Sequence, residues 1–252
     1  MGVIVMSEKW KSFIYGFLSL NLLWLIGHYI IDRPILPSPI VVYGNLDRLF
    51  LEQQLLTHIG QSLYRIFLSL IISVIIGLIL GLLMAQSNFW NKILNPFIYF
   101  TYPIPKIALL PVILLLFGLG DASRITMIVL IIVFQIIINV RDSIRDIPSA
   151  TYDILRCLGA SKWTLFKEIT LPAAFSPLLS SIRVALGTAM SILFITETNG
   201  TRIGLGAYIN AASLRVNYVD MYGGIVVLSA LAFLIFLIID FIEDIFLKWR
   251  EK

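Results

Sequence analysis

The stretch DILRCLGASKWTLFKEITLP, residues 153–172, carries charged and apolar side chains at helical spacing around a single glycine. Gly159 suits the left-handed turn that ends a helix, and Ser149 and Ser161 are placed to cap the helices on either side of it. Two short amphipathic helices of this kind could rest on a lipid surface or seat in a groove of a protein partner. The residue types in this stretch therefore indicate binding rather than catalysis.

Polar side chains also recur inside apolar stretches of the chain. Gln135 and Asn139 are four residues apart and share one helix face, and Arg183 lies deep in a later apolar run that Glu197 closes. Polar groups at membrane depth usually face the interior of a bundle, because facing lipid would leave them unpaired. We therefore expect these four residues to line a path through the bundle. Arg183 would either meet an anion there or pair with a neighbouring helix.

Catalytic and nucleotide-binding motifs are absent from the sequence. It contains no G-x-x-x-x-G-K-[ST], H-E-x-x-H or G-x-S-x-G pattern. Its single cysteine, Cys157, and its two distant histidines, His28 and His58, do not have metal-ligand spacing. We therefore expect no enzyme activity, no metal and no cofactor of its own in this chain.

The composition points to a membrane protein. Of the 252 residues 59% are hydrophobic and 13% are charged, whereas soluble domains have about 45–50% and about 25%. Residues 12–31, 66–82 and 221–239 carry no charge, and a helix of about 20 apolar residues crosses a bilayer. The basic residues lie at the flanks of such runs, so the net charge of +4 does not indicate nucleic-acid binding.

These elements predict an all-α integral membrane protein that forms one domain over residues 1–252. Six spans are expected, at about 11–31, 60–85, 93–118, 124–142, 173–196 and 221–246. The two short helices fall in the loop at about 149–170, between the fourth and fifth spans.

Two of the expected spans carry packing signals. Small residues recur every four positions in the second span, at Ser69, Ser73, Gly77 and Gly81. They predict a face where another helix approaches closely. Four prolines lie in the third span, Pro96, Pro103, Pro105 and Pro111. Because proline removes a backbone donor and clashes with the preceding turn, we expect a kinked or broken helix inside the bundle.

The distribution of basic residues orients the spans. If both termini lie in the cytoplasm, eleven basic residues flank the cytoplasmic side: Lys9, Lys11, Lys92, Arg141, Arg145, Arg156, Lys162, Lys167, Lys248, Arg250 and Lys252. Five lie on the other side: Arg33, Arg48, Arg124, Arg202 and Arg215. Lys and Arg accumulate in short cytoplasmic loops, so this orientation is favoured.

The stretch around Gly159 resembles a motif of ABC importer permeases. That motif reads Glu-Ala-Ala, three residues, Gly, nine residues, Ile, one residue, Leu-Pro. At those positions this chain has, without a gap, Asp153, Gly159, Ile169, Leu171 and Pro172. Asp-Ile-Leu replaces Glu-Ala-Ala, so the acid is shortened and both alanines become bulky.

Other segments resemble the nitrate/sulfonate/taurine-type branch of these permeases. They include LPSPIVVYGNL, LNPFIYFTYPIPKIALLPVILLLFGLGDASRI and FITETNGTRIGLGAYI, and the resemblance covers nearly the whole chain from about residue 36. Lys106 stands where the family more often has an uncharged residue.

The resemblance implies a type I ABC importer permease fold with a cytoplasmic coupling helix, in a bacterial cytoplasmic membrane. Two permease copies, as a homodimer, would pair with two ATPase subunits that bind ATP and magnesium, and an extracytoplasmic binding protein would deliver a small anionic or polar solute. The implied ATPase-coupling residues are Asp153, Leu158, Gly159, Ala160, Ile169, Leu171 and Pro172. Asp153 would contact a basic group of the ATPase, and Leu171 with Pro172 would fix the start of the fifth span.

Two alternatives are consistent with a polytopic membrane chain. A secondary transporter driven by an ion gradient is usually larger and built from internal repeats, and none is visible here. A membrane scaffold would use the two short helices only to rest on lipid. For an importer of this branch, nitrate, bicarbonate, an alkyl sulfonate, taurine and a vitamin precursor such as a pyrimidine or riboflavin are all candidate solutes.

Overall fold

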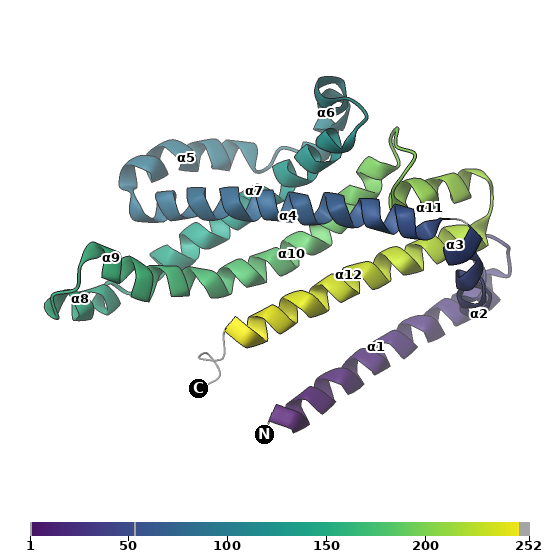
Figure 1. Cartoon of the computed structure of the whole chain (residues 1–252), viewed down its shortest axis with the longest axis horizontal. Coiled ribbons are helices and arrows are strands. Elements are labelled where there is room, and N and C mark those ends of the chain that lie inside the picture. The colour runs from purple at the N-terminus through teal and green to yellow at the C-terminus, as the bar shows by residue number, and fades with distance from the viewer. Residues whose placement is uncertain (1, 53, 247–252) are drawn as a thin grey trace.

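The computed structural model describes residues 2–52 and 54–246, and within them the chain is helical and contains no strand (Figure 1). Lys248, Arg250 and Lys252, which contribute to the expected orientation, lie outside the described residues. The helices are α1 Gly2–Ile31, α2 Pro39–Gly44, α3 Leu46–Glu52, α4 Leu55–Gln86, α5 Asn88–Thr101, η1 Lys106–Leu109, α6 Leu110–Phe117, α7 Asp121–Arg145, α8 Ser149–Cys157, α9 Lys162–Leu165, the π-helical turn η2 Phe166–Thr170, α10 Leu171–Glu197, α11 Leu205–Leu214 and α12 Tyr218–Phe246. The predicted all-α class is confirmed.

The helices provide up to six membrane crossings. Five stretches are long and apolar enough to cross a bilayer: α1, α4, α7, α12 and the continuous helix from Lys162 to Glu197. The bent pair formed by α5 and the segment Lys106–Phe117 also passes this test, as one broken span or as a re-entrant loop, so the described helices give five or six crossings. The chain is therefore a multi-pass membrane protein.

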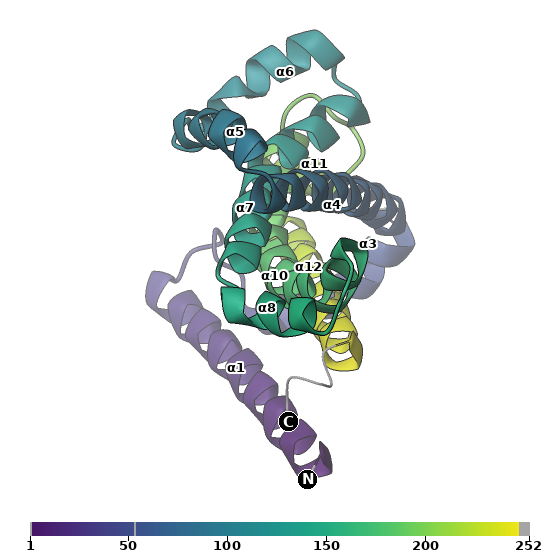
Figure 2. The ribbon, with the colours of Figure 1, turned by 90° about the vertical axis from the view of Figure 1, so that its left-hand side faces the viewer.

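The core of the bundle lies where α4, α7 and α10 pack together (Figure 2). Ser69 and Ser73 are fully buried. A Cβ added at Gly77 would lie 2.5 Å from the Cγ2 of Ile136, and one at Gly81 would lie 2.8 Å from the Cβ of Val140. The predicted small-residue face of the second span is thus confirmed, and it packs against α7.

The third crossing is broken, as its prolines predict. α5 and the helical segment Lys106–Phe117 meet at 83°, and Pro103 and Pro105 lie in the connection. The expected position inside the bundle is wrong for the single chain, because Ile98 and Leu110 are the buried residues of α5 and α6. The break turns α6 away from the line of α5 (Figures 1 and 2); Ile113 and Leu114 pack against the core, whereas Leu115 on the outer face is 86% exposed.

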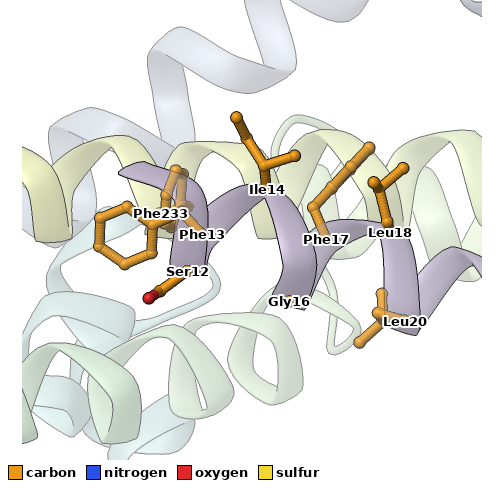
Figure 3. A pocket seen from close by; sticks show the side chains of 8 residues that line it. All are labelled: Ser12, Phe13, Ile14, Gly16, Phe17, Leu18, Leu20 and Phe233. Atoms are coloured by element: carbon orange, nitrogen blue, oxygen red, sulfur yellow. The ribbon is translucent and has the colours of Figure 1, made fainter. Parts of the chain in front are cut away.

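α1 is attached to the bundle mainly through its C-terminal half. The indole of Trp24 stacks on Tyr222 at 5.4 Å between centroids and donates to the carbonyl of Pro37 at 3.0 Å. Toward the N-terminus, Phe13 meets Phe233 edge to face, beside an open apolar pocket of about 520 Å³ (Figure 3). This half of α1 presents apolar side chains outward, as a helix in contact with lipid does.

Candidate functional site

The stretch that resembles the permease motif folds as two short helices and a tight turn, called here the two-helix knob (residues 149–165). Gly159 has a φ of +80°, in the left-handed region. Its amide donates to the carbonyl of Arg156 at 2.9 Å, and the amide of Ala160 donates to the carbonyl of Leu155 at 3.0 Å. These two bonds form the glycine-terminated helix end that the sequence predicts.

One of the two predicted helix caps forms. The Oγ of Ser161 accepts a hydrogen bond from the amide of Thr164 at 3.1 Å and caps α9, as predicted. The capping position of α8 is occupied by Pro148, and no side chain caps that helix. The predicted capping role of Ser149 is therefore wrong, because Ser149 is already the first residue of α8.

The two-helix knob exposes large apolar side chains. Ile154 is 64% exposed, Leu158 78% and Trp163 70%, and α8 buries none of its residues. Asp153 lies beside them and accepts a hydrogen bond from the exposed Arg156 at 2.9 Å. Because an isolated surface ion pair contributes little to stability, the guanidinium and the carboxylate stay available to a partner. Exposed apolar residues with a polar rim are typical of an interaction surface.

The second helix of the knob is the end of the fifth crossing itself. The chain stays helical from Lys162 through the π-turn into α10, and Ile169 and Thr170 are buried there. α10 itself begins at Leu171, with Pro172 in its first turn, so the role of these two residues in fixing the start of the fifth span stays a prediction. The wider π-turn comes directly before the proline, where room for its ring is needed.

Gln135 and Asn139 lie on the face of α7 near α10. The side-chain amide of Asn139 donates to the Oγ of Ser181 at 2.9 Å. Asn139 also borders a polar cavity of about 430 Å³, lined by Asn139, Asp142, Ser143, Asp146, Pro177, Ser180, Ser181 and Val184. Gln135 is half-buried one turn further along α7 and is not among the lining residues.

Arg183 has the carboxylate partners that its depth requires. Its Nη2 donates to Glu243 at 2.5 Å and to Asp240, both on α12. Sequence reasoning asked for a partner on a neighbouring span but did not identify these two. Asp240 and Glu243 lie three residues apart at the end of the last apolar run, and this spacing was the sequence signal that could have identified them as partners. Two carboxylates now neutralise one guanidinium, so Arg183 is not an open site for an anion.

Glu197 is fully buried at the end of the bundle that carries α11. It accepts hydrogen bonds from the Oγ of Ser62 at 2.8 Å, from Arg65 at 2.6 Å and from the amide of Gly206 at 2.8 Å. Arg65 also pairs with Asp121 at 2.7 Å. Glu197 thus joins α4, α10 and α11 and has no exposed surface toward a path.

Within residues 2–52 and 54–246, no group of three or more His, Cys, Asp or Glu side chains could hold a metal.

Lys106, unusual for the resembling family, lies at the break between α5 and α6. Its ammonium donates to the carbonyls of Thr101 and Tyr102 at 3.2 and 3.1 Å. It also lies 4.8 Å from the ring centroid of Phe134 on α7. A cation is favoured at the C-terminal end of a helix, so Lys106 caps α5 where the prolines interrupt the hydrogen-bond ladder.

Comparisons with known proteins define the class of this chain. Residues 57–252 match the family of binding-protein-dependent transport system inner membrane components. The formylaminopyrimidine transport permease protein ThiX of Halalkalibacterium halodurans is 31% identical over 238 residues, which cover 94% of each chain. The taurine transport system permease protein TauC of Escherichia coli is 28% identical, over 86% of this chain and 81% of TauC.

Solved structures agree on the fold. The inward-facing MetNI methionine ABC transporter matches with a TM-score of 0.68 at 21% identity, over 77% of this chain and 97% of that one. A bacterial ABC transporter for alginate import matches with a TM-score of 0.65 at 16% identity, over 96% and 98% of the two chains.

The chain therefore belongs to the family of binding-protein-dependent transport system inner membrane components. It is a permease subunit of an ABC importer with the type I fold, and its relatives place it in the sulfonate/taurine-type branch. The alternative of a gradient-driven secondary transporter has no support from these comparisons.

Proposed function

We propose that this chain carries a small polar solute across a bacterial cytoplasmic membrane, driven by ATP that a partner subunit hydrolyses. ATP and magnesium bind to the partner. The observation that carries the proposal is the two-helix knob, whose exposed Ile154, Leu158 and Trp163 form an apolar surface rimmed by charge. A helix with such a face seats in a groove of a soluble partner.

The coupling role is assigned to the residues that the family motif marks. Asp153 contacts a basic group on the ATPase, and Leu158 and Ala160 flank the glycine turn that shapes the contact. A Cβ at Gly159 would meet nothing within 4 Å, so close packing does not require a glycine here. The glycine is needed for its positive φ. Ile169 is buried and supports the knob from the side of the bundle, next to Leu171 and Pro172.

The working assembly contains two copies of this single-domain chain, two ATPase subunits and a binding protein outside the membrane. Its family is named for dependence on a binding protein, and a structurally similar alginate transporter was solved with its periplasmic protein. The excess of basic residues at the knob end supports an orientation with that end and both termini in the cytoplasm.

The translocation path follows the exposed face of α10 beside the polar cavity at Asn139. Ser180, Gly187 and Ser191 are exposed on that face, an unusual composition for a surface that meets only lipid. Arg183 does not favour an anion, since Asp240 and Glu243 neutralise it. The names of relatives mention formylaminopyrimidine, taurine and riboflavin, which supports a small polar solute.

Affinity purification of the tagged chain from native membranes tests this proposal. Mass spectrometry should identify a P-loop ATPase and an extracytoplasmic binding protein in the same complex. Ligands that then raise the thermal stability of the binding protein identify the solute. Recovery of the chain alone, across several mild detergents, would contradict the proposal.

A further inference from the structure

α8 is weakly held for a helix that must transmit force. None of its residues is buried, and its ion pair from Asp153 to Arg156 stays within the helix. The turn at Gly159 connects it to α9, and no atom lies within 4 Å of the position a Cβ would take there. On its other side α8 is joined to α7 through residues 146–148, but toward α9 and α10 its only chain connection is this unbraced glycine turn, so α8 would swing relative to α10 when it is pushed.

A second connection joins α8 to the base of α10. The Oη of Tyr152 and the Oγ1 of Thr170 lie 3.1 Å apart, within hydrogen-bond distance. Tyr152 is half-buried and Thr170 is 4% exposed, so water competes little for this bond. Figure 1 shows α8 and α9 side by side at the start of α10, and the contact between Tyr152 and Thr170 joins α8 to the π-turn there.

Thr170 belongs to the π-turn, which is the irregular part of the long helix. The amide of Leu171 bonds to the carbonyl of Phe166, five residues back, and Pro172 then supplies no amide donor. A π-turn inside a longer helix is a local departure from the α-helical ladder and is frequent at functional sites. The bond from Tyr152 therefore reaches the long helix where its geometry changes most easily.

The segment beyond the π-turn is firmly packed. Ile169, Ala174 and Leu178 are each at most 9% exposed, and the last two pack in one cluster with Ile144 and Val140 of α7. A displacement passed to Thr170 is therefore carried into the α7–α10 core. Asn139 and Ser181, which border the polar cavity, are also in contact there.

We propose that Tyr152 and Thr170 are positioning residues for coupling: their hydrogen bond fixes α8 to the π-turn, so that displacing the knob moves α10. This inference rests on the proposed function of the knob. Without the bond α8 pivots at Gly159, and the ATPase stays docked while α10 receives less of its motion.

The test uses the permease–ATPase complex and one defined probe. In a Cys157→Ser background, Ser191→Cys places a thiol on the exposed face of α10. Its reaction rate with a water-soluble maleimide is measured with and without ATP plus vanadate. Tyr152→Phe and Thr170→Val, alone and together, remove the hydrogen bond with little change in shape. Tyr64→Phe, at an exposed tyrosine of α4, is the matched control.

We expect the nucleotide-dependent change in labelling rate to fall about threefold in each single variant, the size expected for one net hydrogen bond. The double variant should be no worse than either single one, because both remove the same bond. Retention of the ATPase should stay unchanged, and the melting temperature should fall by no more than about 4 °C, the shift that one net hydrogen bond gives in a chain of this size. This separates positioning from a purely structural role.

Three results would overturn the inference. An undiminished nucleotide response in both single variants, or losses that add in the double variant, would remove the link while leaving the proposed function intact. If the parent Ser191→Cys chain retains no ATPase, the proposed function fails and the inference fails with it.

Discussion

Arg65 and Glu197, 132 residues apart in the chain, meet with an Nη1–Oε1 distance of 2.6 Å, and both side chains are at most 3% exposed. This pair joins the second crossing to the fifth at the bundle end opposite the knob. Because charges removed from water must be paired and hydrogen-bonded, Ser62 and the amide of Gly206 complete the shell of the carboxylate.

Glu197→Gln is expected to destabilise the chain by about 3 kcal/mol, near the lower end of the range for breaking a buried ion pair. The loss stays near that end because Arg65 keeps its second partner, Asp121. Thermal unfolding in detergent measures it. The control is Glu168→Gln, which removes an exposed carboxylate 4.0 Å from Lys167 and should cost less than about 0.5 kcal/mol. Equal effects in the two variants would argue against a structural role for Glu197.

Gly81→Ala and Gly60→Ala should change the free energy of unfolding in opposite directions, although both positions lie in α4. A Cβ at Gly81 would lie 2.8 Å from Val140, whereas at Gly60 nothing lies within 4 Å. Overpacking typically costs about 1–3 kcal/mol, while alanine in an open helical position gains about 0.5–1 kcal/mol over glycine. Unfolding by heat or denaturant gives both values. A Gly81→Ala chain as stable as the parent would show that α4 and α7 are not so closely packed.

Lys106→Met should destabilise the connection between α5 and α6. The variant keeps most of the apolar stem but removes the donor to the carbonyls of Thr101 and Tyr102. Hydrogen bonds from a charged group contribute about 1.5–3 kcal/mol, and a loss of that size should appear in the unfolding free energy. Lys92→Met, at an exposed lysine of α5, is the control and should change little. If both variants unfold alike, Lys106 does not cap α5.

The sequence predicted the helical class, apolar helices for five or six crossings, the small-residue face of α4 and the glycine turn of the knob, because each depends on local pattern. It did not identify the partners of Arg183, since Asp240 and Glu243 lie on a helix whose position depends on tertiary packing. The continuous helix through Pro172 was also missed, because the π-turn that accommodates the proline leaves no clear signal in the residues before it.

The polar residues expected to line the path also show that tertiary contacts cannot be read from local sequence. Their depth was readable from the sequence, but their environments were not. Asn139 borders a cavity, whereas Glu197 is enclosed by donors from two other elements, α4 and α11. Whether a buried polar group faces open space or an ion pair depends on contacts between distant segments. Arg65 and Ser62 were not singled out for that reason.

Retention of the ATPase by a Leu158→Glu chain is the most direct measurement of the coupling role. Leu158 is 78% exposed, and the matched control, Leu214→Glu, changes a leucine that is 77% exposed on α11. Both substitutions should leave the melting temperature unchanged, because neither side chain is packed. We predict that Leu158→Glu loses the ATPase and ATP-driven uptake into proteoliposomes while Leu214→Glu keeps the ATPase. Full ATPase retention and uptake with Leu158→Glu would contradict the coupling role of the two-helix knob.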